Sequence, residues 1–320
     1  MNPVLVSAVS LYSRLSILYQ IYHKSSAVLT LLEKVDALLG PTHLTENATA
    51  IKIFCLLTLL ISFPFQIISY VRLTITSTAV ITQFAIFFLN IYNNFSAACC
   101  ELQFISITWL VFARFRLVHK NLKKIGDALE RNLRRDGIKK NKASQVERSG
   151  EDLSAKIAVL KECRHVLCDV SDRLNQIYNG QLFVSLSSLF VNVLLNLYFA
   201  IFGGFAQPAT QHVNAQMLPS VVNSLTWSLY YFLRFAFICA TADALVNEGN
   251  STRVFISNLM RHRVENNTKE ELWTFLSFAV ARKIKITAYG FFSVNLRLVT
   301  TVEDALRYRK HILGGPRSVT

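Results

Sequence analysis

The feature that most constrains this chain is a set of long stretches without any charged side chain. No Asp, Glu, Lys or Arg occurs in Leu174–Leu233, Leu73–Cys100 or Ile53–Val71. A helix needs about 20 apolar residues, each adding ~1.5 Å, to cross a hydrocarbon layer of ~30 Å. Each stretch has about that length or more, and the first has room for two crossings. The sequence therefore predicts an all-α, polytopic transmembrane helix bundle and argues against a soluble enzyme.

The charged residues that remain are mostly basic and lie between the apolar stretches. Only 17% of the residues are charged, against roughly 25% in soluble domains, yet the formal net charge is +14. Lys and Arg are concentrated in 114–173 and recur in 244–285, whereas 203–222 has neither. Basic loops stay in the cytoplasm, so the first two segments are predicted to be inside and the third outside. This pattern favours membrane orientation over a nucleic-acid partner.

The alternation of apolar and basic stretches divides the chain into six segments. We expect a partial transmembrane helix at 1–23, a helix pair with a cytosolic lead-in at 24–113, a cytosolic basic helical region and loop at 114–178, a transmembrane helix pair at 179–245, a cytosolic helix and the start of the last helix at 246–302, and a divergent charged tail at 303–320.

Two details of local structure follow from periodicity. In the lead-in, apolar residues recur at helical spacing until Gly40 and Pro41 end the pattern. These residues are Val28, Leu31, Leu32, Val35, Leu38 and Leu39. In the basic region, Arg134–Asp152 indicates a flexible loop between two helical flanks. The apolar run at 286–302 starts a seventh apolar segment, but it stops after about seventeen residues and contains Arg297, so we expect the last span to be incomplete.

Side chains that carry chemistry are scattered through the sequence. The seven His residues form no cluster, and the six Cys residues lie in or beside apolar segments without metal-ligand spacing. There is no phosphate-binding loop and no pair of carboxylates in a plausible cleft. We therefore expect no catalytic residues, no cofactor, no metal and no disulfide framework.

Glu101 and Arg234 are ionisable residues within or near predicted spans. Such residues are costly at membrane depth and are usually functional or paired, although near the cytosolic end they also serve structural roles. The aromatic group Trp227, Tyr230 and Tyr231 would suit a small polar organic ligand, or else an interfacial belt or helix packing. Weaker candidates for the same ligand pocket are Gln83, Phe84, Phe87, Asn196 and Tyr198.

Three stretches carry a recognisable pattern. They are Ala97–Leu122 (AACCELQFISITWLVFARFRLVHKNL), Leu174–Leu182 (LNQIYNGQL), and Phe275–Phe278 (FLSF) with Ile286–Leu296 (ITAYGFFSVNL). Together they resemble the insect gustatory receptor family, relatives of the insect odorant receptors. The last stretch is the most specific, because in that family a Thr-Ala-x-Gly-Phe-Phe segment leads into the final helix.

This resemblance implies a seven-helix subunit with a cytoplasmic N-terminus in a tetrameric, ligand-gated cation channel. A tastant pocket would lie in the outer half of the helices, and the seventh helix would line the pore. Thr287, Gly290, Phe291 and Phe292 would then link the sensing helices to the pore. The implied partners are a small-molecule tastant, membrane lipid and other subunits in a homo- or hetero-tetramer. The implied location is the plasma membrane of chemosensory neurons.

The chain also departs from the family pattern. The Thr-Tyr-x5-Gln-Phe signature of the last helix is absent, the pattern ends after Val302, and residues 1–23 match the second family helix. We therefore expect incomplete first, second and last helices. The alternative function is a truncated, non-conducting subunit that modulates full-length receptors. A G-protein-coupled receptor would need the opposite loop charges and an Asn-Pro-x-x-Tyr motif, and a transporter would show an inverted repeat.

Overall fold

The computed structural model describes Tyr19 and the segments 26–39, 80–136, 143–202, 214–261 and 266–300. The rest of the predicted first segment, the apolar stretch Ile53–Val71 and the tail at 303–320 lie outside these residues. The described secondary structure consists mainly of a helix at 26–39 and the elements α3 (Val80–Asp136), α4 (Ala143–Phe202), α5 (Asn214–Leu259) and α6 (Asn266–Ala281), with a small hairpin of β1 (Thr287–Ala288) and β2 (Phe292–Ser293).

The three long helices are much longer than a membrane is thick. α3 has 57 residues, α4 has 60 and α5 has 46, so α4 alone is about 90 Å long at ~1.5 Å per residue. Each of the three contains a segment long and apolar enough to cross a membrane: Asn94–Arg131, Leu153–Phe202 and Val221–Leu259. A hydrocarbon core of ~30 Å holds only about a third of α4, so each helix has a membrane part and a part that projects beyond it.

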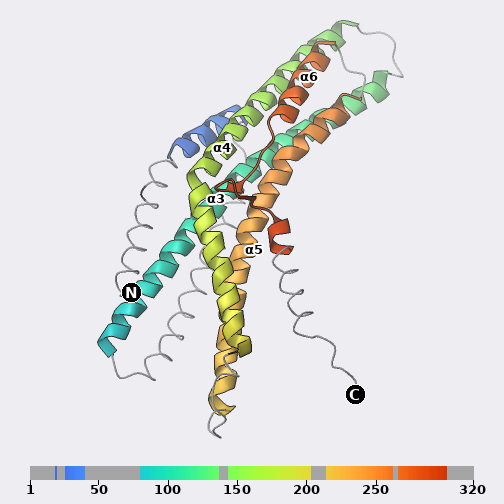
Figure 1. Cartoon of the computed structure of the whole chain (residues 1–320). Helices are drawn as coiled ribbons and strands as arrows, with labels where there is room; N and C mark the ends of the chain where they lie inside the picture. The colour runs from blue at the N-terminus through green and yellow to red at the C-terminus, as the bar shows by residue number, and fades with distance from the viewer. Residues whose placement is uncertain are drawn as a thin grey trace, which may run out of the picture.

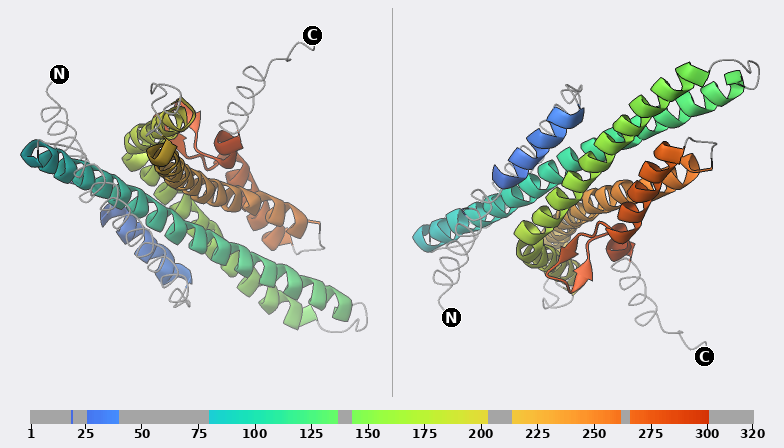
Figure 2. Two further views of the ribbon diagram at one scale, coloured as in Figure 1. Left: turned by 90° about the horizontal axis from the view of Figure 1, so that it is seen from below. Right: turned by 90° about the horizontal axis from the view of Figure 1, so that it is seen from above.

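Figure 1 shows how the two parts are arranged. α3, α4 and α5 cross near the middle of the molecule, α4 and α5 continue together on one side, and α3 diverges from them. On the other side the same three helices gather with α6 and the 26–39 helix. The views in Figure 2 show this helix beside α4 and α3, and α6 on the opposite flank of the group.

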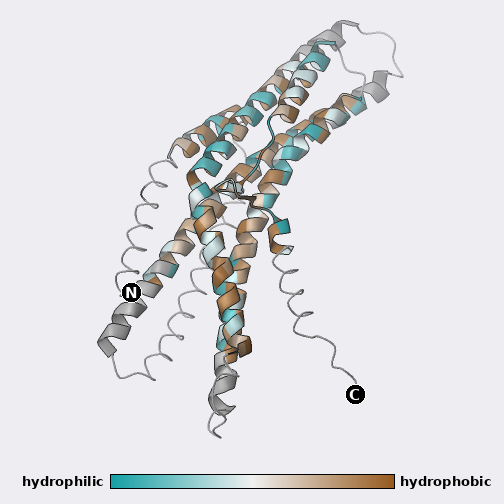
Figure 3. Cartoon of the chain, viewed as in Figure 1, coloured by the Kyte–Doolittle hydropathy of each residue, from teal (hydrophilic) through white to brown (hydrophobic). Residues whose placement is uncertain are grey.

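The paired ends of α4 and α5 present apolar side chains outward. In Figure 3 these ends are largely hydrophobic, whereas hydrophilic residues are frequent in the opposite part. The outward residues recur at helical spacing, and each is close to half exposed or more: Val184, Val191, Leu195, Phe199, Val222, Leu225, Leu229 and Leu233. Soluble monomers rarely leave an apolar surface of this extent uncovered, so these faces are suited to contact lipid tails.

The other half of the molecule is a packed helical domain, which we call the basic bundle. It consists of the 26–39 helix, α6, and the parts of the long helices at 104–131, 153–182 and 238–259, with a continuous core that includes Phe115, Leu167 and Phe275. Ionic contacts join its helices. Arg114 on α3 donates two hydrogen bonds to Asp36, at 2.8 and 2.6 Å, and Lys161 on α4 contacts Glu271 on α6 at 2.8 Å.

The predicted periodicity of the lead-in is confirmed. Val28, Leu32 and Val35 are at most 2% exposed against the core of the basic bundle, and Leu31, Leu38 and Leu39 pack beside them. The predicted loop at Arg134–Asp152 was too long, because α3 runs to Asp136 and α4 already begins at Ala143. Ala, Gln, Glu and Arg, which have high helix propensity, make up half of the residues in 143–152, and their propensity outweighs the polar character of this stretch.

Candidate functional site

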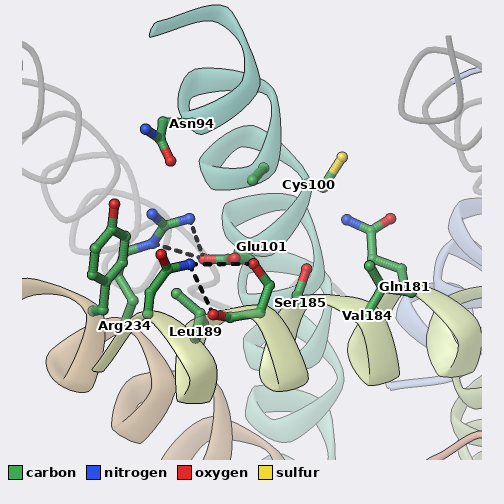
Figure 4. A pocket seen from close by; sticks show the side chains of 12 residues that line it. Asn94, Cys100, Glu101, Gln181, Val184, Ser185, Leu189 and Arg234 are labelled. Carbon is green, nitrogen blue, oxygen red and sulfur yellow. Dashed lines mark hydrogen bonds and ion pairs between the residues drawn. The ribbon is translucent and has the colours of Figure 1, made fainter. Parts of the chain in front are cut away.

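A buried ion pair lies where α3, α4 and α5 meet in their membrane parts. Arg234 on α5 binds one carboxylate oxygen of Glu101 on α3, with Nε at 2.9 Å and Nη2 at 2.8 Å from Oε2. The side chains of the two residues are only 8% and 7% exposed. Figure 4 shows the guanidinium directed at the carboxylate, across the face of α4. Charge-assisted bonds of this kind offset part of the cost of holding two charges away from water.

Side chains from all three helices, most of them polar, line a partly open pocket of about 60 Å³ beside this pair. α4 contributes Gln181, Ser185, Ser188 and Asn192, which recur every three or four residues and therefore share one helix face. The same spacing brings Asn94, Ala97 and Glu101 to one face of α3, and Tyr231 and Arg234 to one face of α5. The remaining lining residues are Cys100, Val184 and Leu189. Figure 4 shows the side chains that line this pocket.

The predicted aromatic group forms a cluster beside the cavity. The ring centroids of Trp227, Tyr230 and Tyr231 lie 5.5 to 5.7 Å from one another, and Trp227 stacks on Tyr231. The guanidinium carbon of Arg234 is 5.3 Å from the centroid of the Tyr230 ring, which is within the range of a cation–π interaction. The cluster therefore supports Arg234 on one side, and Tyr231 also lines the cavity.

Of the weaker ligand candidates, Asn196 and Tyr198 do not line this cavity. Asn196 donates to the carbonyl oxygen of Asn192 within α4, at 2.8 Å, and Tyr198 is 48% exposed beside Phe199 and Phe202. The side chains of Gln83, Phe84 and Phe87 lie outside the described residues. Sequence reasoning missed Gln181, Ser185, Ser188 and Asn192. Their common signal is a polar stripe at helical spacing inside an uncharged span, and such a stripe can be read from the sequence.

The predicted pore-linker residues lie in the β-hairpin, not in a helix. Thr287 pairs with Ser293 and Ala288 with Phe292, and the turn residues Tyr289 and Gly290 have positive φ angles of 52° and 76°. Positive φ at both central residues is typical of a type I′ β-turn, and the bond from Phe291 N to Ala288 O at 3.0 Å closes this turn. Helix resumes at 296, so the hairpin precedes the last described helical segment. Backbone pairing across the turn replaces helical bonds in this stretch, with Val294 N bonded to Ile286 O at 2.9 Å.

Asn175 of α4 holds the hairpin in place. Its side-chain oxygen accepts from the Thr287 backbone nitrogen at 2.8 Å, and its nitrogen donates to the Thr287 hydroxyl at 3.3 Å. Phe183 of α4 adds ring contacts to Tyr289, Phe291 and Phe292, with centroids 5.4 to 6.4 Å apart. The same helix, α4, therefore carries both the attachment of the hairpin and, beginning about two turns after Asn175, the polar cavity.

We expect Asn175→Leu to free the hairpin from α4, because the substitution removes both side-chain bonds at similar size. The cost is about 1–3 kcal/mol, as for a buried backbone donor left without its acceptor. Limited proteolysis should then cut near Tyr289 faster than in the parent chain, and the Tm of the solubilised protein should fall. Asn247→Leu is the matched control, since exposed Asn247 bonds Asp243 of its own helix and, within the part of the chain that the structure describes, no other element. Equal rates of proteolysis in the two variants would contradict the attachment of the hairpin by Asn175.

No group of three His, Cys, Asp or Glu side chains that could hold a metal ion occurs among the described residues. The chemistry that the cavity offers is instead hydrogen bonding and a fixed dipole. Fold and site together define a multi-pass helical membrane protein with a polar pocket between its membrane helices. The family model described as 7tm Chemosensory receptor matches residues 3–302. The chain belongs to this family of chemosensory receptors.

The fold of the chain is also similar to that of solved receptor structures. The structure is similar to the insect olfactory receptor OR5 from Machilis hrabei, with a TM-score of 0.52, 14% identity, and coverage of 97% of this chain and 77% of that one. The same receptor in complex with eugenol gives a TM-score of 0.52, 13% identity, and coverage of 96% and 77%. No curated protein matches the chain in sequence.

Proposed function

We propose that the chain is a gustatory receptor subunit of the insect type, a ligand-gated cation channel that detects small-molecule tastants. The observation that carries the proposal is the polar cavity at the Glu101–Arg234 pair, because it lies between three membrane helices of a chemosensory receptor fold. The solved complex of the olfactory receptor OR5 with eugenol supports small-molecule binding by this fold. The subunit would act in the plasma membrane of chemosensory neurons, as part of a homo- or hetero-tetramer.

The mechanism requires that a tastant bind the open state better than the closed state, since only this difference shifts the equilibrium. The cavity joins α3, α4 and α5, and α4 carries the hairpin that precedes the helix at 296–300. A ligand that changes the spacing of these helices would therefore move the attachment at Asn175. This gives Thr287, Gly290, Phe291 and Phe292 their proposed role as the linker between sensing helices and pore.

The test is expression in cells with a low background conductance, followed by recording of currents during application of a tastant panel. We expect tastant-evoked cation currents from the chain, and loss of these currents in Ser185→Leu, which fills the cavity. Current that appears only with a second receptor, and is altered by this chain, would instead support the modulating subunit. Absence of any effect, alone or with partners, would contradict both functions.

The orientation of the chain has a separate test. We propose that the basic bundle faces the cytoplasm, because the stretches 114–173 and 244–285, which form much of it, hold most of the Lys and Arg residues. An epitope tag placed between residues 137 and 142 should be reached by antibody only after the cells are permeabilised. Labelling of intact cells would favour the opposite orientation, which is that of a G-protein-coupled receptor.

A further inference from the structure

A second and much larger cavity lies in the basic bundle. Its volume is about 570 Å³, and its lining comes from the 26–39 helix, α3 and α4, which Figure 2 shows beside one another. On α3 the lining residue Lys124 follows Glu101 by 23 residues, which is ~35 Å along the helix at ~1.5 Å per residue. The whole hydrocarbon core is only ~30 Å thick, so this cavity belongs to the part of the molecule that projects beyond the membrane.

The walls of this cavity are mainly apolar. Asn121 is the one uncharged polar residue in the described lining. Cavities of ~300–1,000 Å³ with mostly apolar walls and a few polar groups are typical binding sites for small organic molecules. The cavity therefore has the size and the walls of a site for a ligand with a large apolar part. Its apolar lining residues are Leu38, Leu39, Ile125, Ala128, Leu153, Ala155, Val159 and Leu160.

The charge in the lining has one sign. Lys124 on α3 and Lys156 on α4 both line the cavity, and no Asp or Glu is present among its described lining residues. Both lysine side chains are exposed, so each can lay its apolar stem along the wall and keep its ammonium group in water. The Glu101–Arg234 pair, in contrast, cancels its own charge. The ligand that complements this cavity therefore carries a negative charge at its solvated end.

The length of the lining limits the apolar part of the ligand. The lining residues on α3 lie within 121–128 and those on α4 within 153–160, and each stretch is ~10 Å long at ~1.5 Å per residue. An extended alkyl chain of about eight to ten carbons has a similar length, since each C–C bond is ~1.5 Å. A single chain of this kind matches the cavity, with its charged head in the solvent at the lysines.

We propose that this cavity binds an anionic amphiphile with one alkyl chain of about ten carbons, held between the 26–39 helix, α3 and α4 with its head at Lys124 and Lys156. A medium-chain fatty acid has this chemistry. Lysine presents a compact point charge, so it accepts a carboxylate, sulfate or phosphate head alike. The site is separate from the polar cavity at the ion pair, and binding to it can be measured without channel activity.

The experiment is photo-crosslinking of the purified chain in lipid nanodiscs, with a decanoic acid that carries a diazirine on its alkyl chain. Mass spectrometry of the digested protein locates the labelled residues. We expect saturable labelling within 121–128 and 153–160. Unlabelled decanoate should compete about tenfold better than decanol, because the two have the same chain and differ in the charge of the head.

Two variants test the two parts of the site. Lys124→Gln combined with Lys156→Gln should raise the probe concentration for half-maximal labelling about tenfold and remove the preference for decanoate, because it removes two solvent-screened charge contacts. Lys123→Gln is the control, since exposed Lys123 neighbours Lys124 but does not line the cavity. Val159→Trp should abolish the labelling by filling the cavity, and Val159 is 40% exposed, so the fold tolerates a larger side chain there.

Val254→Trp is the control for the filled cavity, because Val254 is 54% exposed on α5 and does not line it. Absence of labelling within 121–128 and 153–160 in the parent chain would overturn the proposal. Equal labelling of Val159→Trp and Val254→Trp would overturn it as well. Equal competition by decanol and decanoate, or equal effects of Lys123→Gln and the double lysine variant, would show that the two lysines do not select the head of the ligand and would overturn the anionic class.

Discussion

Glu101→Gln is expected to lower the free energy of unfolding by about 3–5 kcal/mol, because it removes the partner of a buried guanidinium. Arg234 would remain charged, since a guanidinium does not give up its proton in proteins. Among the described residues the Tyr230 ring would still lie beside it, with a centroid 5.3 Å away, and this ring cannot replace a carboxylate. The loss should appear as a lower Tm of the solubilised protein and as reduced surface expression.

Arg234→Gln should be milder than Glu101→Gln, although both remove one member of the pair. The carboxyl group of Glu101 can take up a proton and become neutral, whereas Arg234 cannot. Glu101→Leu combined with Arg234→Met should recover much of the lost stability, since apolar residues of similar size often replace a buried pair without cost. The exposed pair of Lys34 and Glu162, 57% and 49% exposed, gives the control. Glu162→Gln should change stability by less than about 1 kcal/mol.

The double variant also separates structure from function. If it folds and reaches the surface but no longer responds to tastants, the pair contributes to recognition beyond holding α3 to α5. If it responds as the parent chain does, the role of the pair is to join the helices. A single Glu101→Gln variant as stable as the parent would contradict the burial and pairing described here.

Much of this architecture could be predicted from sequence, because it depends on summed hydrophobicity. Uncharged runs such as Leu174–Leu233 place helices in the membrane, and residues such as Val28 and Leu32 mark the buried face of a helix by periodicity alone. The hairpin was missed because hydropathy does not distinguish an apolar helix from an apolar β-turn. Only the φ angles at Tyr289 and Gly290 make that distinction.

The candidate site was harder to predict than the spans because it depends on contacts between distant residues. A direct pair of Glu101 and Arg234 is possible on their predicted depth, but the sequence alone does not establish that α3 and α5 lie close enough for the two side chains to meet. The polar face of α4 was overlooked because Gln, Ser and Asn interrupt an apolar run without adding charge. That this polar face belongs to a site is evident only from the structure, in which α3 and α5 bring the ion pair opposite it.

Substitution of a second buried arginine should have the opposite effect on the free energy of unfolding. Arg164 lies in the core of the basic bundle with 0% exposure, and its Nε and Nη1 atoms have no hydrogen-bond partner among the described residues. Its Nη2 atom approaches the carbonyl oxygens of Gly249 and Ala279 at only 3.5 and 3.4 Å, longer than good hydrogen bonds. The cost of burying this charge is therefore only partly offset, in contrast to Arg234.

We expect Arg164→Met to leave the unfolding free energy unchanged or to raise it by about 1–4 kcal/mol, the range found when buried charges are replaced by apolar residues. Methionine is long and adaptable enough to fill the same space between α4, α5 and α6. Arg282→Met is the control, because Arg282 is 31% exposed and bonds Asp172 at 2.7 Å, so its loss should lower the Tm slightly. A large drop in the Tm of Arg164→Met would mean that this guanidinium has a strong partner in the assembled receptor. Stabilisation would instead show that the basic bundle retains a destabilising charge, as proteins do where a site is kept for function rather than for folding.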